Sequence, residues 1–310
     1  TNNECRELLD KPADVVLMNG FEDDFVPKGA TFTGKRKRAR STMLRVANCL
    51  LGEDLGDGTL IIGTSGRYEF KNKGIDVFLE SLNRLNRDKD LKKKVLAFVN
   101  VPSWVGDPRE DLQKRLKSKD KFTEPLQCPF ITHWLHNMTH DQVLDMLKYL
   151  GMGNRPEDKV KVIFVPCYQD GHDGILNKHY YDLILGEDLS VYPSYYEPWG
   201  YTPLESVAFR VPTITTDLAG FGLWVNSLKN QHGINDGVEV LHRSDYNYSE
   251  VADGIKDTVA LFSTKTEAEI KEIRKRAGQV AEQALWKHFI QYYYEAYDIA
   301  LRNAMKRQLK

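Results

Sequence analysis

Short apolar runs alternate with amphipathic stretches along this chain of 310 residues. The runs are almost continuous in apolar and β-branched residues, which is typical of parallel strands covered by helices on both faces. This pattern predicts strands over residues 14–20, 59–66, 94–100, 160–166, 189–194, 211–217 and 237–243.

The stretches between these runs have helical periodicity. "GIDVFLESLNRL" places Ile75, Phe78, Leu79, Leu82 and Leu85 on one stripe, and "HDQVLDMLKYLG" behaves in the same way. The alternation predicts an α/β fold with a Rossmann-like, doubly wound parallel sheet. We expect this Rossmann-like domain to cover residues 1–264, with long C-terminal helices over 265–310 packing on it.

Charge and composition exclude several classes of protein. The 43 basic and 44 acidic residues nearly cancel, so no nucleic-acid or membrane partner is indicated. No apolar run approaches the roughly 18 residues of a membrane span. By composition, "GKRKRAR" (34–40) resembles a nucleic-acid patch; we interpret it as a solvated loop that leads into a helix.

The four cysteines are scattered without a C-x-x-C pair, which indicates neither a zinc site nor a disulfide framework. A reduced, cytoplasmic setting fits this pattern. The chain starts "TNNECRELLD", without an initiator Met or a signal pattern, so we expect it to be an excised piece of a longer protein.

One string, "YPSYYEPWGYTPLES" (192–206), joins a predicted strand to a predicted helix. "YTPLES" matches a capping box, with Thr202 as N-cap, Pro203 at the first helical position and Glu205 at the third. In an open α/β sheet, a helix N-terminus at the end of a strand offers N–H groups to an anion. Gly200 allows a close backbone approach, so the junction suits a phosphate. Taken alone, the two glutamates need no ligand: Glu197 fits an ordinary turn residue, and Glu205 fits a helix-capping residue.

A second junction, "SGRYEFKNKG" (65–74), has the same strand-to-helix position. Arg67, Lys71 and Lys73 lie on it, and an arginine with a lysine suits a diphosphate. Taken alone, these cations are compatible with solvated loop residues. Together with the other junction they predict a pyrophosphate site, where positive charge stabilises a leaving group.

These residues resemble a known family. "GRYEFKNKG", "THWLHNM" and "YPSYYEPWGYTPLES" followed by "VPTITTDLAGFG" are similar to the glycogen synthases of the animal and fungal type. Those enzymes are UDP-glucose-dependent, retaining glycosyltransferases of the GT-B fold. The resemblance runs from "MNGFEDDF" to "ALWKHFIQYYYEA" and implies the C-terminal, donor-binding half of such an enzyme.

The resemblance implies roles for individual residues. Arg67 and Lys73 match the basic pair that compensates the charge of the departing diphosphate. Glu197 matches the first glutamate of the family's E-x7-E motif, beside the glucosyl ring, and Glu205 matches the second, beside the ribose. We therefore expect Arg67, Lys73 and Glu197 to be catalytic and Glu205 to bind the donor.

Further donor contacts are implied. The backbone of Gly200, Tyr201 and Thr202 matches the helix N-terminus that receives the phosphates, and Tyr180 matches the aromatic residue that stacks on uracil. We expect His133 to line the donor cleft. His133, His136 and His140 have the spacing of a helix face, yet no carboxylate or cysteine cluster stands beside them in the sequence. We expect no metal and no other cofactor.

The implied partners are UDP-glucose, an α-glucan such as glycogen, and an N-terminal acceptor domain expected to precede Thr1; a homo-oligomer stays open. The region "STKTEAEIKEIRKRAGQ" has acidic residues where eukaryotic members carry an arginine cluster that senses glucose-6-phosphate, so we expect that activation to be weak or absent. Three alternatives remain: an ADP-glucose donor, a sucrose- or trehalose-type acceptor, and a non-catalytic nucleotide-sugar-binding module.

Overall fold

The computed structural model describes residues 2–229 and 231–308. Six parallel strands form its main sheet in the order β5-β2-β1-β6-β7-β8. They are β1 (Leu60–Ser65), β2 (Val95–Asn100), β5 (Val160–Val165), β6 (Leu189–Val191), β7 (Thr213–Thr216) and β8 (Val238–Leu241). The predicted doubly wound parallel sheet is therefore confirmed, as are six of the seven predicted strands.

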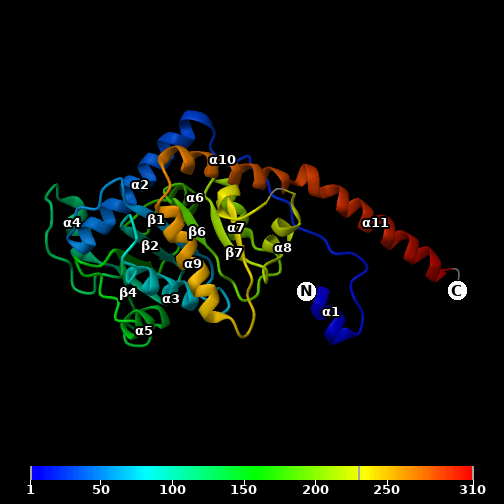
Figure 1. The fold of residues 1–310 in the computed structure, drawn as a ribbon, viewed down its shortest axis with the longest axis horizontal. Helices are drawn as coiled ribbons and strands as arrows, with labels where there is room; N and C mark the ends of the chain where they lie inside the picture. Colours follow the sequence, from blue (N-terminus) through cyan, green and yellow to red (C-terminus); the bar gives the residue numbers. More distant parts are fainter. Residues whose placement is uncertain (1, 230, 309–310) are drawn as a thin grey trace.

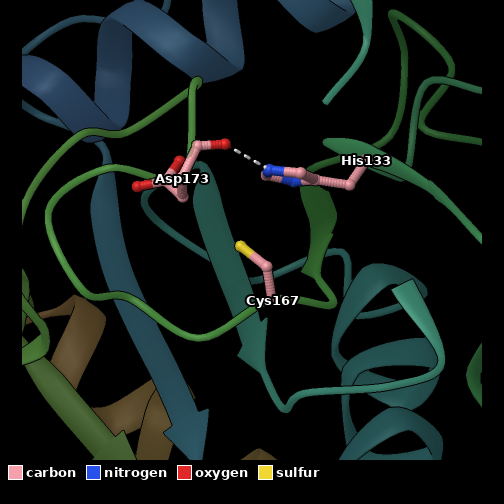
Figure 2. Close-up of side chains that lie close together, drawn as sticks. All are labelled: His133, Cys167 and Asp173. Carbon is pink, nitrogen blue, oxygen red and sulfur yellow. Dashed lines mark hydrogen bonds between the residues drawn. The ribbon is translucent and has the colours of Figure 1, made fainter. Parts of the chain in front are cut away.

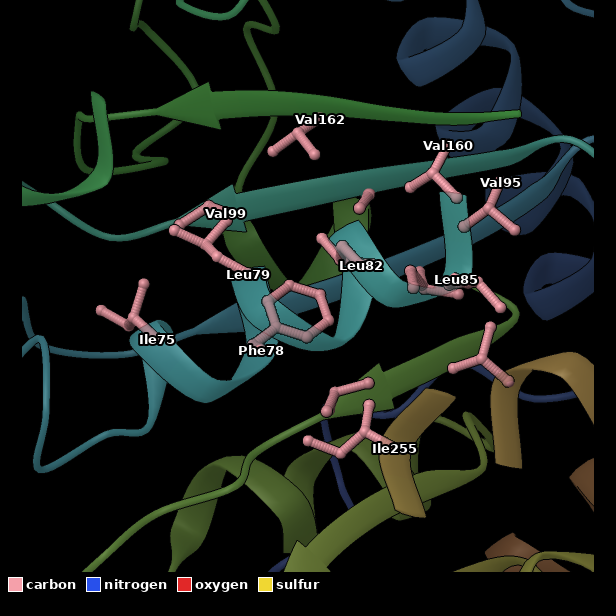
Figure 3. Packing of buried hydrophobic residues seen from close by; sticks show 14 of the residues in the cluster. Ile75, Phe78, Leu79, Leu82, Leu85, Val95, Val99, Val160, Val162 and Ile255 are labelled. Carbon is pink, nitrogen blue, oxygen red and sulfur yellow. The ribbon is translucent and has the colours of Figure 1, made fainter. Parts of the chain in front are cut away.

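Helices cover both faces of this sheet (Figure 1). One face is packed by α3 (Ile75–Asn86), α5 (Gln142–Tyr149) and α9 (Tyr248–Ser263), and Figure 3 shows Phe78 of α3 and Ile255 of α9 in this layer. The opposite layer includes α2 (Gly29–Leu51), α4 (Glu110–Lys117), α6 (Tyr180–Ile184), α7 (Tyr201–Ala208) and α10 (Glu267–Gln283).

The central strands read as unbroken apolar runs because both of their faces are buried. Along β2, Val95, Ala97 and Val99 belong to the layer of α3, whereas Leu96 and Phe98 belong to the layer of α2. Alternate side chains of a strand point to opposite faces, so each face needs its own apolar set.

A shorter two-stranded sheet lies outside the main one. It consists of β3 (Val105–Pro108) and β4 (His133–Leu135), which pair in antiparallel fashion. The remaining helices are α1 (Asn2–Leu9), α8 (Gly220–Ser227), the 3-10 turn η1 (Ile234–Asp236) and α11 (Trp286–Gln308). No helix of the described residues is long and apolar enough to cross a membrane.

The strand predicted over residues 14–20 is wrong. Within the described ranges this segment pairs with no strand, and Val16 is 60% exposed. Phe21, the residue after this segment, is hydrogen-bonded to the start of α11. Its N–H donates to Ala284 O, and its carbonyl accepts from Trp286 N. The ring of Trp286 packs directly against Gly20, so the end of this segment lies on α11 and does not enter the sheet.

The interpretation of residues 34–40 as a loop is also wrong, because they lie inside α2. The C-terminal tail forms two helices. Ala277 and Ala281 of α10 are buried against α7, and Phe289 in the first turns of α11 is buried as well, whereas the rest of α11 extends away from the sheet (Figure 1). The domain boundary at 264/265 stays a prediction; it falls in the turn between α9 and α10.

Candidate donor site at the β1–β6 switch point

The sheet has a topological switch point between β1 and β6. From β1 the chain proceeds to β2 and β5 on one side, and from β6 it proceeds to β7 and β8 on the other. The loops that leave the carboxyl ends of β1 and β6 therefore diverge, and open α/β sheets bind their ligands in the crevice formed there. These two loops carry the two junctions singled out from the sequence, 65–74 and 192–206.

The two junctions touch each other directly. Tyr195 N donates to Asn72 O at 2.8 Å. Gly74, with a φ of 68°, lies so close to the Pro193 carbonyl that a Cβ on it would be 2.0 Å from the oxygen. The same oxygen accepts a hydrogen bond from the Arg243 guanidinium. Only glycine fits this position, because it needs both a left-handed backbone and no side chain.

Lys73 and Glu197 form an ion pair across the crevice. The Lys73 Nζ contacts Glu197 Oε2, with the side chains 15% and 19% exposed. The backbone of Glu197 is held from the other side, since its N–H donates to Leu218 O at 3.2 Å and its carbonyl accepts from Gly220 N at 3.0 Å. Two residues separated by 124 positions are thus brought together with their charged ends at one place.

The N-terminus of α7 has no side-chain cap. The helix begins at Tyr201, and its N-cap is Gly200, with a φ of 107°. The predicted capping box is therefore wrong: Thr202 lies inside the first turn, and Glu205 makes its hydrogen bond elsewhere. Uncapped N–H groups at a helix start favour an anion, both as donors and through the helix dipole.

Glu205 is held by a residue that the sequence analysis did not single out. Tyr181 donates its hydroxyl hydrogen to Glu205 Oε1 at 2.8 Å. The Tyr181 ring stacks on Phe209, with centroids 5.3 Å apart and planes 2° from parallel. Burial raises the pKa of Glu205, and the Tyr181 hydrogen bond partly opposes that rise.

Hydroxyl groups form a chain beneath the crevice. Ser65 Oγ at the end of β1 lies 2.8 Å from Tyr180 OH and 3.3 Å from Tyr192 OH, and Tyr192 OH lies 2.8 Å from Ser206 Oγ. Burial raises the pKa of Tyr192 to about 12, so this phenol stays protonated. The chain holds the half-buried Tyr180 at the end of β1, beside the switch point.

Two predicted site residues, Arg67 and His133, make their polar contacts with residues other than Lys73, Glu197 and Glu205. Arg67 is 77% exposed, and its Nε is 2.9 Å from Glu69 Oε1. His133 is buried on β4, where Nε2 lies 2.7 Å from Asp173 O and Nδ1 lies 2.9 Å from Thr132 Oγ1. Among the described residues no hydrogen bond joins His133 to either junction, and its place in the donor cleft stays a prediction.

The histidines of "THWLHNM" do not share a helix face, because His133 belongs to a strand. His133 instead clusters with Cys167 and Asp173, whose ligand-type atoms lie within 4.8 Å of one another (Figure 2). Burial raises the pKa of the Cys167 thiol to about 12. Both oxygens of the Asp173 carboxylate already accept backbone N–H groups of residues 175–177. The three groups stabilise the loop that follows β5.

The fold and the crevice define a class. This is a doubly wound α/β domain whose ligand site lies at the switch point and offers a helix N-terminus, a lysine and a carboxylate. Such a combination suits a phosphorylated ligand that also carries hydroxyl groups.

A sequence model described as glycogen synthase matches residues 4–108 and 107–310, so the chain belongs to the glycogen synthase family. It is 27% identical to glycogen [starch] synthase of Neurospora crassa, covering 98% of this chain and 51% of that protein. It is 29% identical to glycogen [starch] synthase isoform 2 of Saccharomyces cerevisiae, covering 99% of this chain and 52% of that protein. The chain thus spans about half the length of these curated relatives.

The fold is also similar to a solved structure, a sucrose-phosphate synthase from Thermosynechococcus elongatus. The TM-score is 0.52 at 15% sequence identity, over 97% of this chain and 56% of that chain. At this identity the comparison supports the shared architecture alone.

Proposed function

We propose that this chain is the donor-binding half of a glycogen synthase that transfers glucose from UDP-glucose to the non-reducing end of an α-1,4-glucan. The observation that carries the proposal is the crevice between β1 and β6, where Lys73, Glu197 and the uncapped start of α7 converge. Membership of the glycogen synthase family supports the same conclusion.

In this proposal the diphosphate binds at the N-terminus of α7, and the peptide N–H groups of Tyr201 and Thr202 donate to it. Lys73 lies between that anion and Glu197, so it can compensate charge on both as UDP departs. Arg67, on the exposed part of the same loop, is free to turn toward the diphosphate once its contact with Glu69 is released. No divalent metal is needed for this charge balance.

The donor's other groups are assigned to neighbouring residues. Glu197 accepts hydrogen bonds from the glucosyl hydroxyls, Glu205 accepts them from the ribose, and the Tyr180 ring supports the uracil. The acceptor hydroxyl attacks the anomeric carbon on the face that UDP leaves, and a donor phosphate oxygen takes its proton, so configuration is retained. The acceptor domain lies outside this chain, so we expect the isolated chain to bind donor weakly and to transfer little glucose.

Calorimetric titration of UDP and of ADP into this chain, without divalent metal, tests the proposal. We expect UDP to bind in preference to ADP, and the binding to be lost in Tyr180→Ala and in Arg67→Ala. Tyr246→Ala, at a tyrosine that is 93% exposed, provides a matched control and is expected to bind UDP as wild type does. Preference for ADP would retain the site but replace the donor, and binding that survives Tyr180→Ala would contradict the site.

A further inference from the structure

Arg243 is a buried arginine just beyond the carboxyl end of β8. It follows the last residue of this strand by two positions and is 5% exposed. Its backbone N–H donates to Asp217 Oδ1 at 2.9 Å, which ties it to the end of β7. Its guanidinium donates to Pro193 O and lies 5.4 Å from the ring centroid of Tyr195. One side chain therefore connects the end of β8 to the 192–206 junction that follows β6.

Arg243 also contacts the 65–74 junction. A Cβ on Gly74 would be 2.7 Å from Arg243 Nη1, so the guanidinium lies against the backbone of the residue that follows Lys73. Arg243 thus touches one junction at the residue after Lys73 and the other at a residue four positions before Glu197. Lys73 and Glu197 are the two side chains that form the ion pair of the crevice.

The charge of Arg243 is poorly compensated. Among the residues that the structure describes, no carboxylate forms an ion pair with this guanidinium, and the neutral Pro193 carbonyl is its hydrogen-bond acceptor. Burial lowers the pKa of Arg243, and the charge of Asp76 opposes this only in part. A buried charge with neutral contacts costs free energy, and an apolar side chain would fill the same space at lower cost. Such an exception to ordinary core packing is typical of a functional site.

A guanidinium is suited to hold two chain segments in a fixed geometry. It is planar, presents several N–H donors in a rigid fork and packs on aromatic rings, whereas a lysine offers one ammonium group on a flexible stem. Arg243 holds the Pro193 carbonyl and the Tyr195 ring together in this way. Displacing a reacting group by about 1 Å lowers a rate by roughly 100-fold. The contact therefore lies where it controls the geometry of the charged pair in the crevice.

We propose that Arg243 is a positioning residue of the donor crevice: it fixes the two junctions against each other and thereby sets the place where Lys73 and Glu197 meet. The proposal rests on the function proposed above, because that function gives Lys73 and Glu197 their roles. Arg243 acts through these two residues and does not touch the donor, because its own side chain is almost completely buried. An arginine that only stabilised the fold would act on folding and not selectively on the reaction.

Steady-state kinetics of the full-length protein with UDP-glucose and glycogen test the proposal. Arg243→Met removes the guanidinium but keeps a side chain of similar length. We expect its kcat to fall roughly tenfold and its KM for UDP-glucose to change less than about threefold, because the misplaced Lys73 acts on the leaving group. Arg243→Lys keeps the charge and one donor group, so it recovers part of the lost kcat.

Arg115→Met is the matched control. Arg115 also donates to backbone carbonyls, those of Cys49 and Glu124, and also packs on an aromatic ring, that of Phe122. It lies on α4, and these contacts join α2 to the loop that follows α4, outside both junctions. We expect this variant to keep the wild-type kcat and KM.

The Lys73→Ala background separates a positioning role from a structural one. In this background Arg243→Met should lower kcat by no more than about threefold, because the group that Arg243 positions is absent. An equal fall of kcat in both backgrounds would show a general effect on the fold and would overturn the proposal, as would a lower melting temperature with wild-type kcat. If Arg243→Met does not fold, Arg243→Lys decides: a reduced kcat at the wild-type melting temperature supports the proposal, and a wild-type kcat overturns it.

Calorimetric titration of UDP keeps this proposal distinct from the proposed function. A full-length wild type that transfers no glucose, together with a chain that binds no UDP, overturns the proposed function and with it this role of Arg243. Glucose transfer that proceeds equally in wild type and Arg243→Met overturns the positioning role alone and leaves the donor crevice intact.

Discussion

Glu187 is a buried carboxyl group whose protonation state sets a measurable pH dependence. It lies just before β6, 4% exposed, and accepts a hydrogen bond from Ser190 Oγ at 2.7 Å. On its other side it packs against Gly63 of β1, where a Cβ would be 2.1 Å from Oε1. Burial, reinforced by the neighbouring carboxylate of Asp188, raises the pKa of Glu187 from 4.5 to about 8.

Because the pKa of Glu187 is raised in the folded chain, the stability of the fold decreases as the pH rises. The folded chain holds the Glu187 proton more tightly than the unfolded chain, so the stabilisation is complete below pH 4.5 and is lost as the pH rises through about 8. Between these values the free energy of unfolding falls by up to about 1.4 kcal/mol per pH unit. The fall is roughly 2 kcal/mol from pH 6 to pH 8, because the slope flattens near the folded pKa of about 8. Glu187→Gln replaces the protonated carboxyl with a neutral amide and removes this slope.

Urea denaturation, followed by tryptophan fluorescence at pH 6 and pH 8, measures the difference. We expect Glu187→Gln to lose roughly 2 kcal/mol less than wild type over this interval. All other ionisable groups are the same in both proteins and cancel in the comparison. Glu157→Gln, at an exposed glutamate, serves as the matched control and is expected to follow wild type. Parallel pH dependence of wild type and Glu187→Gln would refute the reasoning.

Three other predictions concern the activity of the full-length protein and the donor crevice. Lys73→Ala should lower kcat by about two orders of magnitude, with a smaller effect on KM, because the lost charge acts on the leaving group; a change in KM alone would contradict this. Tyr181→Phe keeps the stacked ring but removes the hydrogen bond to Glu205, so UDP affinity should fall about tenfold in calorimetry, whereas unchanged affinity would exclude a positioning role. Glucose-6-phosphate should change the rate less than twofold, because Arg274 of α10 is buried and Arg276 is paired with Asp236; a several-fold rise would refute this.

The sequence predicted those features that depend on local signals. Unbroken apolar runs identified six strands because each is covered on both faces, and the two strand-to-helix junctions were visible from glycine, proline and charged residues at their ends. The run at 14–20 failed because it pairs with no strand of the described residues and only its end, at Gly20, packs on α11. The hydrophobic periodicity of a short apolar segment does not by itself distinguish a strand in a sheet from a segment that packs on a helix.

The parts that could not be predicted depend on long-range contacts. Tyr181 reaches Glu205 across 24 positions, and Arg243 reaches the Pro193 carbonyl across 50. Neither contact has a motif of its own: the first joins the two helices on either side of β6, and the second depends on β6, β7 and β8 being neighbours in the sheet. The capping box failed because the helix begins two residues earlier than predicted, with Gly200 as its N-cap.

The composition of the basic run "GKRKRAR" suggests a positive patch, but α2 places its cations on different faces. Arg36 and Arg40 are four residues apart, so they lie on one face of α2, and both donate to the Asp188 carboxylate, at 2.6 and 2.7 Å. These two arginines hold the pKa of Asp188 below its usual range although the group is buried. Lys37 and Arg38 point to solvent on the other face. Lys35 pairs with Asp182, so three of the five cations of the run form ion pairs within the fold, and the exposed remainder is too small to attract a polyanion.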